Sequence, residues 1–187
     1  QGAFVGYVII AGALLGLLLV GERWLRLTRI QRSIDRQLSD LDSTRLDNPL
    51  GRILNAYDEN QHLDDLETIS RKLEVVVIED VGEISKGLPV IKILATVAPL
   101  TGLLGTVVGM IETFQSITLF GTGDPKTMAS GISKALMTTV LGLCVAIPTT
   151  LLHAIVNSRS RELVHIIEEQ SAGIIADHAE KAGRPLG

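Results

Sequence analysis

The sequence predicts an all-α membrane protein with three transmembrane helices and long helices that extend into the cytoplasm. The 187-residue chain has a mean hydropathy of +0.34 although 20% of its residues are charged, so its apolar residues must be concentrated in a few segments. Aromatic residues make up only 3% of the chain. This composition fits helices packed through small side chains better than a globular core. No segment alternates between apolar and polar residues as a half-buried strand does.

The first predicted transmembrane helix covers residues 1–21. Residues 2–20 contain no charged side chain, and about 20 apolar residues are needed to cross the hydrocarbon core of a bilayer. The stretch is followed by Glu22-Arg23-Trp24 and not by a small-residue cleavage site, which favours a spanning helix over a signal peptide. Because the chain begins at Gln1 and not at Met, we expect it to be a processed or truncated product.

The second and third transmembrane helices are predicted over residues 88–111 and 135–156. The second contains one charged residue, Lys92, close to its end, where a long side chain reaches the interface. The third contains no charge apart from the titratable His153. Residues 112–134 between them are expected to form a short outer loop.

The arginines predict the orientation of the chain in the membrane. Basic residues favour the cytoplasmic side, and five arginines follow the first span: Arg23, Arg26, Arg29, Arg32 and Arg36. Two more, Arg159 and Arg161, follow the third span, whereas the outer connection holds only Lys126 and Lys134. The amino end is therefore expected outside, with residues 22–87 and the tail 157–187 inside.

The cytoplasmic segments are predicted to be helical. Apolar residues recur every three or four positions in both parts of the 22–87 region and again in the tail, which is typical of amphipathic helices. The pattern stops at Asn48-Pro49 and Gly51, so two long helices are expected in the 22–87 region. The three stripes are Leu27, Ile30, Ile34, Leu38 and Leu41; Leu66, Ile69, Leu73 and Val76; and Leu163, Ile166, Ile167, Gln170 and Ile174.

The second and third spans carry small residues at a spacing that allows membrane helices to approach closely. These predicted packing residues are Ala98, Gly102, Gly105 and Gly109 in the second span, and Gly142 and Ala146 in the third. Each span also contains a proline, Pro99 and Pro148, at which we expect a helix break. Close packing alone would explain this pattern.

Threonines in the same two spans suggest a polar seam between them. Thr106 lies in the second span and Thr138 and Thr139 in the third. A threonine hydroxyl can also bond to its own helix, so one threonine alone is uninformative. Neither span contains an aspartate or glutamate. A proton path through these helices would therefore need an acid from a partner protein.

Several function classes are not expected. The net charge is −4 and no basic run is interleaved with aromatic residues, which argues against nucleic-acid binding. Cys144 is the only cysteine, so it excludes an internal disulfide and a cysteine-based zinc site; we expect a packing residue, with a reactive thiol as the alternative. The histidines are scattered, so no metal, cofactor or enzyme activity is expected. His153 is interpreted as an interfacial packing residue, or as a proton-exit group.

Two segments carry these small residues and threonines: residues 98–109 (APLTGLLGTVVG) and residues 131–148 (GISKALMTTVLGLCVAIP). They resemble the two signature helices of the MotA/TolQ/ExbB proton-channel family, and the chain is most similar to ExbB. The resemblance implies a pentameric channel in the bacterial inner membrane that surrounds partner helices of the ExbD type, each with an intramembrane aspartate. It also implies that proton flow energises a TonB-type protein, which drives uptake of iron-siderophores through outer-membrane receptors. Some longer members carry an added periplasmic domain.

The resemblance also implies functional residues. Thr106 and Thr139 match the family's pore threonines, and Thr138 and Lys134 are expected to line the pore with them. Lys134 departs from the family, which usually has a glutamate at that position. It is expected either to form a ring of positive charge at the outer mouth or to extend to the interface as an anchor. Glu112 is a candidate ion-pair partner for it.

Three other functions share parts of this pattern. A TolQ-like subunit for envelope integrity or a MotA-like flagellar stator would have the same spans, although MotA-type chains usually have four. From a different class, a structural or signalling membrane coiled coil would use the amphipathic stripes.

Overall fold

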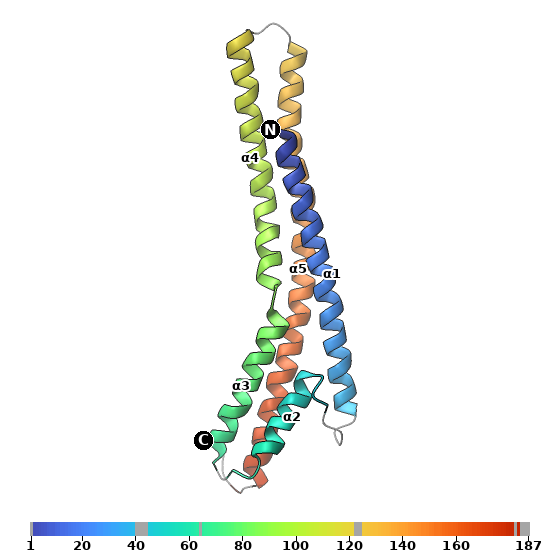
Figure 1. Cartoon of the computed structure of the whole chain (residues 1–187), viewed down its shortest axis with the longest axis vertical. Helices are drawn as coiled ribbons and strands as arrows, with labels where there is room; N and C mark the ends of the chain where they lie inside the picture. Colours follow the sequence, from blue (N-terminus) through green and yellow to red (C-terminus); the bar gives the residue numbers. More distant parts are fainter. Residues whose placement is uncertain (1, 40–44, 64, 122–124, 182, 184–187) are drawn as a thin grey trace. The chain divides into compact units, whose positions relative to one another are not determined.

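The described residues of the chain form five α-helices (Figure 1). The computed structural model describes residues 2–39, 45–63, 65–121, 125–181 and 183. Its helices are α1 (Gly2–Ser39), α2 (Pro49–Asn60), α3 (Leu66–Ser85), α4 (Leu88–Phe120) and α5 (Pro125–Lys181). Three helical stretches are long and apolar enough to cross a membrane, and the described residues contain no strand. The predicted all-α membrane fold is confirmed.

The helices form two compact units. The membrane unit comprises Gln1–Glu22 and Gly87–Ile155, and the second unit comprises Arg23–Lys86 and Val156–Gly187. The first half of α1, the whole of α4 and the first half of α5 belong to the membrane unit. The remainder of α1 and α5 joins α2 and α3 in the second unit.

The segment 112–134 is not the loop that its sequence suggests. Helix α4 continues to Phe120 and α5 already begins at Pro125. Gly121 ends α4 with φ 77° and ψ −179°, a conformation that is essentially open only to glycine, and its N–H donates to the Ile117 carbonyl at 2.8 Å. The polar residues after Ile111 end the apolar stretch but do not end the helix, because polar residues are compatible with helical backbone. The helix ends only at Gly121.

The two intramembrane prolines do not break their helices. Pro99 lies inside α4 and Pro148 inside α5, and helical backbone continues on both sides of each. The expected breaks are therefore wrong. A proline removes one N–H donor, but unwinding the flanking turns would leave several more backbone groups unpaired in an apolar surrounding, so the helix continues.

Residues 23–86 contain one more helix than predicted, because α2 and α3 are separate. The predicted break falls at Asn48, which caps α2: its Oδ1 accepts the Gly51 N–H at 2.8 Å and Pro49 follows it, whereas Gly51 lies inside α2 and does not interrupt it. Asp65 begins α3 and accepts from the N–H groups of Glu67 and Thr68. The predicted helix stripe begins at Leu66, directly after this cap.

The buried face of the second unit includes polar residues at helical spacing. Leu27 and Ile34 are buried as predicted, but Leu38 is 40% exposed and Gln37 takes the buried position. The Oε1 of Gln37 accepts from the Arg45 N–H at 3.0 Å and from Asn48 Nδ2 at 3.3 Å. At 3.6 residues per turn, positions 37 and 38 lie about 60° and 40° from position 34, on opposite sides of it, so helical spacing alone does not decide which of the two is buried.

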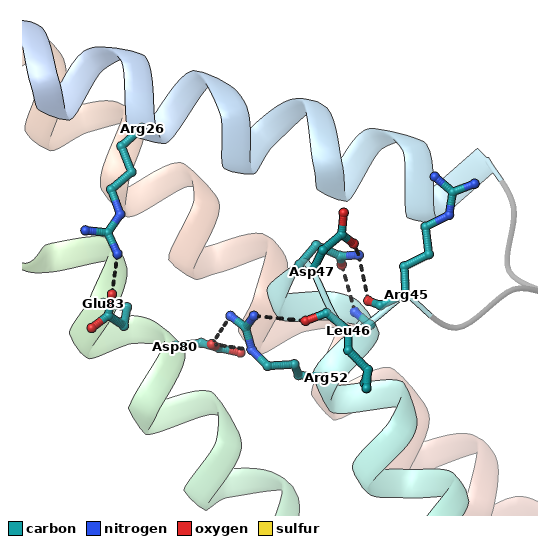
Figure 2. A network of polar contacts seen from close by, with 9 residues as sticks. Arg26, Arg45, Leu46, Asp47, Arg52, Asp80 and Glu83 are labelled. Carbon is teal, nitrogen blue, oxygen red and sulfur yellow. Dashed lines mark hydrogen bonds and ion pairs between the residues drawn. The ribbon is translucent and has the colours of Figure 1, made fainter.

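A polar network joins α2 to α3 and to the segment that precedes α2 (Figure 2). Arg52 donates to Oδ1 of Asp80 from Nε at 3.0 Å and also from Nη2. Its Nη1 donates to the Leu46 carbonyl oxygen at 3.3 Å. The Asp80 side chain is only 5% exposed. Buried carboxylates need such partners, so this pair fixes α2 on α3.

Candidate functional site

Helices α4 and α5 pack against each other in the membrane unit with almost no side chain between them. A Cβ atom added to Gly142 would lie 2.8 Å from the Ala98 carbonyl oxygen and 3.1 Å from the Gly102 Cα. A Cβ on Gly102 would lie 2.8 Å from the Thr138 carbonyl oxygen. These distances are too short for any side chain larger than hydrogen. The two backbones are therefore in direct contact at Gly102 and Gly142.

The same contact line continues away from that crossing. A Cβ on Gly105 would meet Thr138 Oγ1 at 2.6 Å, and one on Gly109 would meet the Ala135 Cβ at 2.7 Å. Positions rise along α4 as they fall along α5, so the helices are antiparallel. The predicted packing residues Ala98, Gly102, Gly105, Gly109 and Gly142 all lie on this line.

Helix α1 packs against both of these helices. A Cβ on Gly105 would lie 2.8 Å from Val5 Cγ1, and one on Gly16 would lie 3.6 Å from Thr149 Cγ2. Ala146 is buried, 6% exposed. Cys144, which we expected to be a packing residue, is exposed, because its position falls off the line formed by Gly142 and Ala146.

Three threonine hydroxyls gather where α4 and α5 touch. Thr106 Oγ1 and Thr139 Oγ1 are hydrogen-bonded to each other, and each also lies 3.2 Å from the Gly102 carbonyl oxygen. Thr138 Oγ1 lies 2.7 Å from the Ala135 carbonyl oxygen and 3.1 Å from that of Gly102. The carbonyls thus accept hydroxyl protons from both helices.

The hydrogen bonds of the Thr106–Thr139 pair can change direction. Each hydroxyl has one proton and two lone pairs, so one threonine donates to the other, which in turn donates to a backbone carbonyl. Rotation of both hydroxyls reverses this order. The pair can therefore accept a hydrogen bond from one polar group or donate a hydrogen bond to another without any movement of the backbone.

A groove of about 1020 Å³ lies between the later part of α4 and the early part of α5. Its lining includes Glu112 and Thr113 from α4, and Lys134 and Thr138 from α5. Lys134 is exposed. Thr106 and Thr139 are not among the lining residues. Of the four predicted pore residues, Lys134 lies only in the groove, Thr106 and Thr139 lie at the helix contact, and Thr138 belongs to both.

The candidate ion pair between Lys134 and Glu112 is not formed. Both side chains line the groove, but among the described residues no ion pair joins them. No group of three histidine, cysteine, aspartate or glutamate side chains in the described part of the chain is placed to hold a metal ion.

The second unit contains polar contacts that sequence reasoning missed. The Tyr57 hydroxyl lies 3.0 Å from Nδ1 of His178, so α2 contacts α5 near its end. Glu83 forms an ion pair with Arg26 (Figure 2) and another with Lys86. Lys86 and Arg26 lower the pKa of the Glu83 carboxyl below the ordinary value of 4.5. The Tyr57–His178 and Arg26–Glu83 contacts join positions far apart in the sequence, so no local pattern indicates them, whereas Lys86 follows Glu83 by only three positions.

A protein-family model matches residues 45–169 of this chain, a range that includes the α4–α5 contact and its threonines. The chain belongs to the MotA/TolQ/ExbB proton channel family. The resemblance inferred from the two threonine-bearing spans is confirmed.

Curated relatives in this family carry ExbB and TolQ names. The biopolymer transport protein ExbB of Aquifex aeolicus is 42% identical over 80 residues, which is 43% of this chain and 54% of the relative. ExbB of Helicobacter pylori is 43% identical over 67 residues, 36% of this chain and 46% of the relative. The Tol-Pal system protein TolQ of Pseudomonas aeruginosa is 28% identical over 99 residues, 53% of this chain and 43% of the relative. The matches span about half the length of these relatives.

Proposed function

We propose that this chain is an ExbB-like subunit of an inner-membrane proton channel which, with an ExbD-type partner, uses the proton-motive force to energise TonB-dependent uptake across the outer membrane. Membership of a proton channel family and the ExbB names of two relatives support the proposal. The observation that carries it is the hydrogen-bonded Thr106–Thr139 pair between two apolar helices.

The threonine pair suits a partner carboxyl that gains and loses a proton. Residues 88–111 and 135–156 contain no aspartate or glutamate, so the titrating group comes from the intramembrane aspartate of the partner. A protonated carboxyl donates to a lone pair of a threonine hydroxyl. An ionised carboxylate accepts from the same hydroxyl after rotation. The pair thus stabilises both protonation states in a site from which bulk water is excluded.

The channel is a homo-oligomer, a pentamer in this proposal, with the partner helices in its centre. The amino end of the chain faces the periplasm and the tail faces the cytoplasm, as the arginines predict. Native mass spectrometry of the purified complex should give one dominant multimer. A stable monomer would contradict this part of the proposal.

Two other energy-coupling roles are the nearest alternatives, a TolQ-like envelope motor and a MotA-like stator. The TolQ relative supports the first of these. A structural or signalling coiled coil would use the helices of the second unit and would not need the threonine pair.

Gene deletion and complementation separate these possibilities. Loss of siderophore-dependent growth is expected for the proposed role, whereas detergent sensitivity alone indicates a Tol role and loss of motility a stator. Proton flux in liposomes that contain the chain and its partner tests the channel itself. A complex that supports uptake but passes no protons above empty liposomes would overturn the channel mechanism.

A further inference from the structure

Arg23 occupies a buried position just beyond the uncharged stretch 2–20. It is 6% exposed, and it lies four positions before Leu27 and eleven before Ile34, which are both buried on the same face of α1. This spacing places Arg23 in line with apolar side chains. A guanidinium in such a place is strongly disfavoured unless an acceptor satisfies it.

The described residues supply no acceptor for Arg23. Its Nη1 atom is shielded from solvent and has no hydrogen-bond partner, and no ion pair of the described residues includes Arg23. Two other arginines of this unit, Arg26 and Arg52, form ion pairs, with Glu83 and Asp80 respectively. The group that satisfies Arg23 must therefore come from outside the described chain.

The residues next to Arg23 in the sequence carry features of a membrane–water interface. The next residue, Trp24, is 38% exposed, and the guanidinium carbon of Arg159 lies 4.4 Å from the centre of its ring. Tryptophan is enriched at the level of lipid headgroups, and a cation over its ring is held by the electrons of the ring face. Arg23 and Arg159 also lie within a few residues of the ends of the apolar stretches 2–20 and 135–156.

We propose that Arg23 binds the phosphate of an anionic phospholipid headgroup, in a site that Trp24 and Arg159 complete. Phosphate oxygens match the planar fork of a guanidinium and accept two of its hydrogen bonds. Headgroup phosphates lie at the level where the apolar stretch of α1 ends, and basic pockets between membrane helices on the cytoplasmic side bind anionic headgroups. The proposal requires only that the chain spans a membrane, so it does not depend on proton conduction.

Trp24 provides a direct readout because it is the one tryptophan in the sequence. The purified chain is reconstituted in bilayers of phosphatidylcholine that contain either brominated phosphatidylglycerol or brominated phosphatidylcholine at equal mole fraction. Stronger quenching of Trp24 by the brominated phosphatidylglycerol is expected for the wild-type chain. Equal quenching by the two lipids would overturn the proposal.

Matched variants then test whether Arg23 is the residue that binds the lipid phosphate. Arg23→Gln should weaken the affinity for phosphatidylglycerol about tenfold or more, since it removes charge-assisted hydrogen bonds. Arg29→Gln removes the same charge from an exposed position on α1 and should change that affinity less than about twofold, as expected for a screened surface charge. Equal losses in the two variants would indicate general attraction to the bilayer and would overturn the site.

Two further measurements identify the ligand. In detergent, phosphatidylglycerol should raise the thermal unfolding temperature of the wild-type chain, and inorganic phosphate at equal concentration should not. Equal stabilisation by inorganic phosphate would show that the ligand is a free anion and would overturn the proposal of a lipid headgroup. If Arg23→Gln does not fold, Arg23→Lys keeps the charge without the planar fork and should show a reduced preference for phosphatidylglycerol; an unchanged preference would contradict the bidentate contact.

Discussion

Thr106 on α4 and Thr139 on α5 are hydrogen-bonded through their side-chain hydroxyls, although 33 positions separate them in the sequence. This contact exists because Gly102 and Gly142 allow the two backbones to touch one turn away. Small residues therefore do more than pack the helices, since they bring polar groups of both helices to one point. Three of our predictions concern this contact and the groove beside it.

Removal of either hydroxyl should impair energy coupling while leaving assembly intact. Thr106→Val and Thr139→Val keep the side-chain shape but leave a partner carboxyl under-satisfied, at a cost of about 1–3 kcal/mol. Siderophore-dependent growth should fall, and pull-down of the partner should be unchanged. Thr101→Val is the matched control, because that hydroxyl bonds only to the Val97 carbonyl of its own helix. Normal growth of both variants would remove the hydroxyls from the mechanism.

Lys134 should set the pH dependence of proton flux if it lies at the mouth of the channel. Its positive charge lowers the pKa of a nearby partner carboxyl, so Lys134→Glu should move the half-maximal flux to higher pH, with Lys134→Gln in between. The assay is flux in liposomes that contain the chain and its partner. Lys126→Gln, outside the groove lining, is the control. Identical profiles for all variants would identify Lys134 as an interfacial anchor.

An alanine at the α4–α5 crossing should destabilise the membrane unit. The Cβ of Gly142→Ala would lie 2.8 Å from the Ala98 carbonyl oxygen, so the helices must separate, and such overpacking costs about 1–3 kcal/mol. Gly12→Ala has open space around its Cβ and should be neutral or stabilising by up to about 1 kcal/mol. Thermal unfolding in detergent measures both. Equal stability of the two variants would contradict the direct backbone contact.

Loss of Arg52 should destabilise the second unit strongly because it leaves Asp80 buried without its cation. Arg52→Leu should cost about 3–5 kcal/mol, and the double variant with Asp80→Leu should cost less than Arg52→Leu alone. Arg71→Leu breaks the exposed pair with Glu67 and should change stability by less than about 1 kcal/mol. Chemical denaturation of the four proteins gives the comparison. A double variant as unstable as the single one would show that burial of Asp80 is not the cause.

The carboxyl of Glu83 should titrate below its ordinary range. Lys86 and Arg26 lower its pKa from the ordinary value of 4.5, so its contribution to stability is present above pH 4.5 and is lost as the pH falls through the lowered pKa. Arg26→Gln should raise that pKa but not fully restore it, because Lys86 remains. A pH titration followed by NMR of the labelled carboxyl measures the shift. An unchanged pKa in the variant would show that Arg26 has no part in it.

Local sequence patterns were sufficient to predict the transmembrane helices of this protein. The uncharged run 2–20, the single charge Lys92 in the next span and the small-residue spacing around Gly102 were sufficient to predict three apolar helices and their close packing. Hydrophobicity and residue size act over a few positions, so they can be recognised without knowledge of the partner segments. The cap at Asn48 was predictable for the same reason, since the Asn-Pro pair is a local signal.

The sequence alone determined that the chain has helices long and apolar enough to span a membrane and that no acid lies within the apolar spans. Only the tertiary structure decided that helix continues through Pro99, that Thr106 meets Thr139, that Lys134 shares a groove with Glu112 and that Arg23 is buried. The physical reason is that each of these outcomes depends on groups far apart in the chain. Whether a hydroxyl or a guanidinium has a hydrogen-bond partner depends on how the helices pack. No single stretch of the sequence determines that packing.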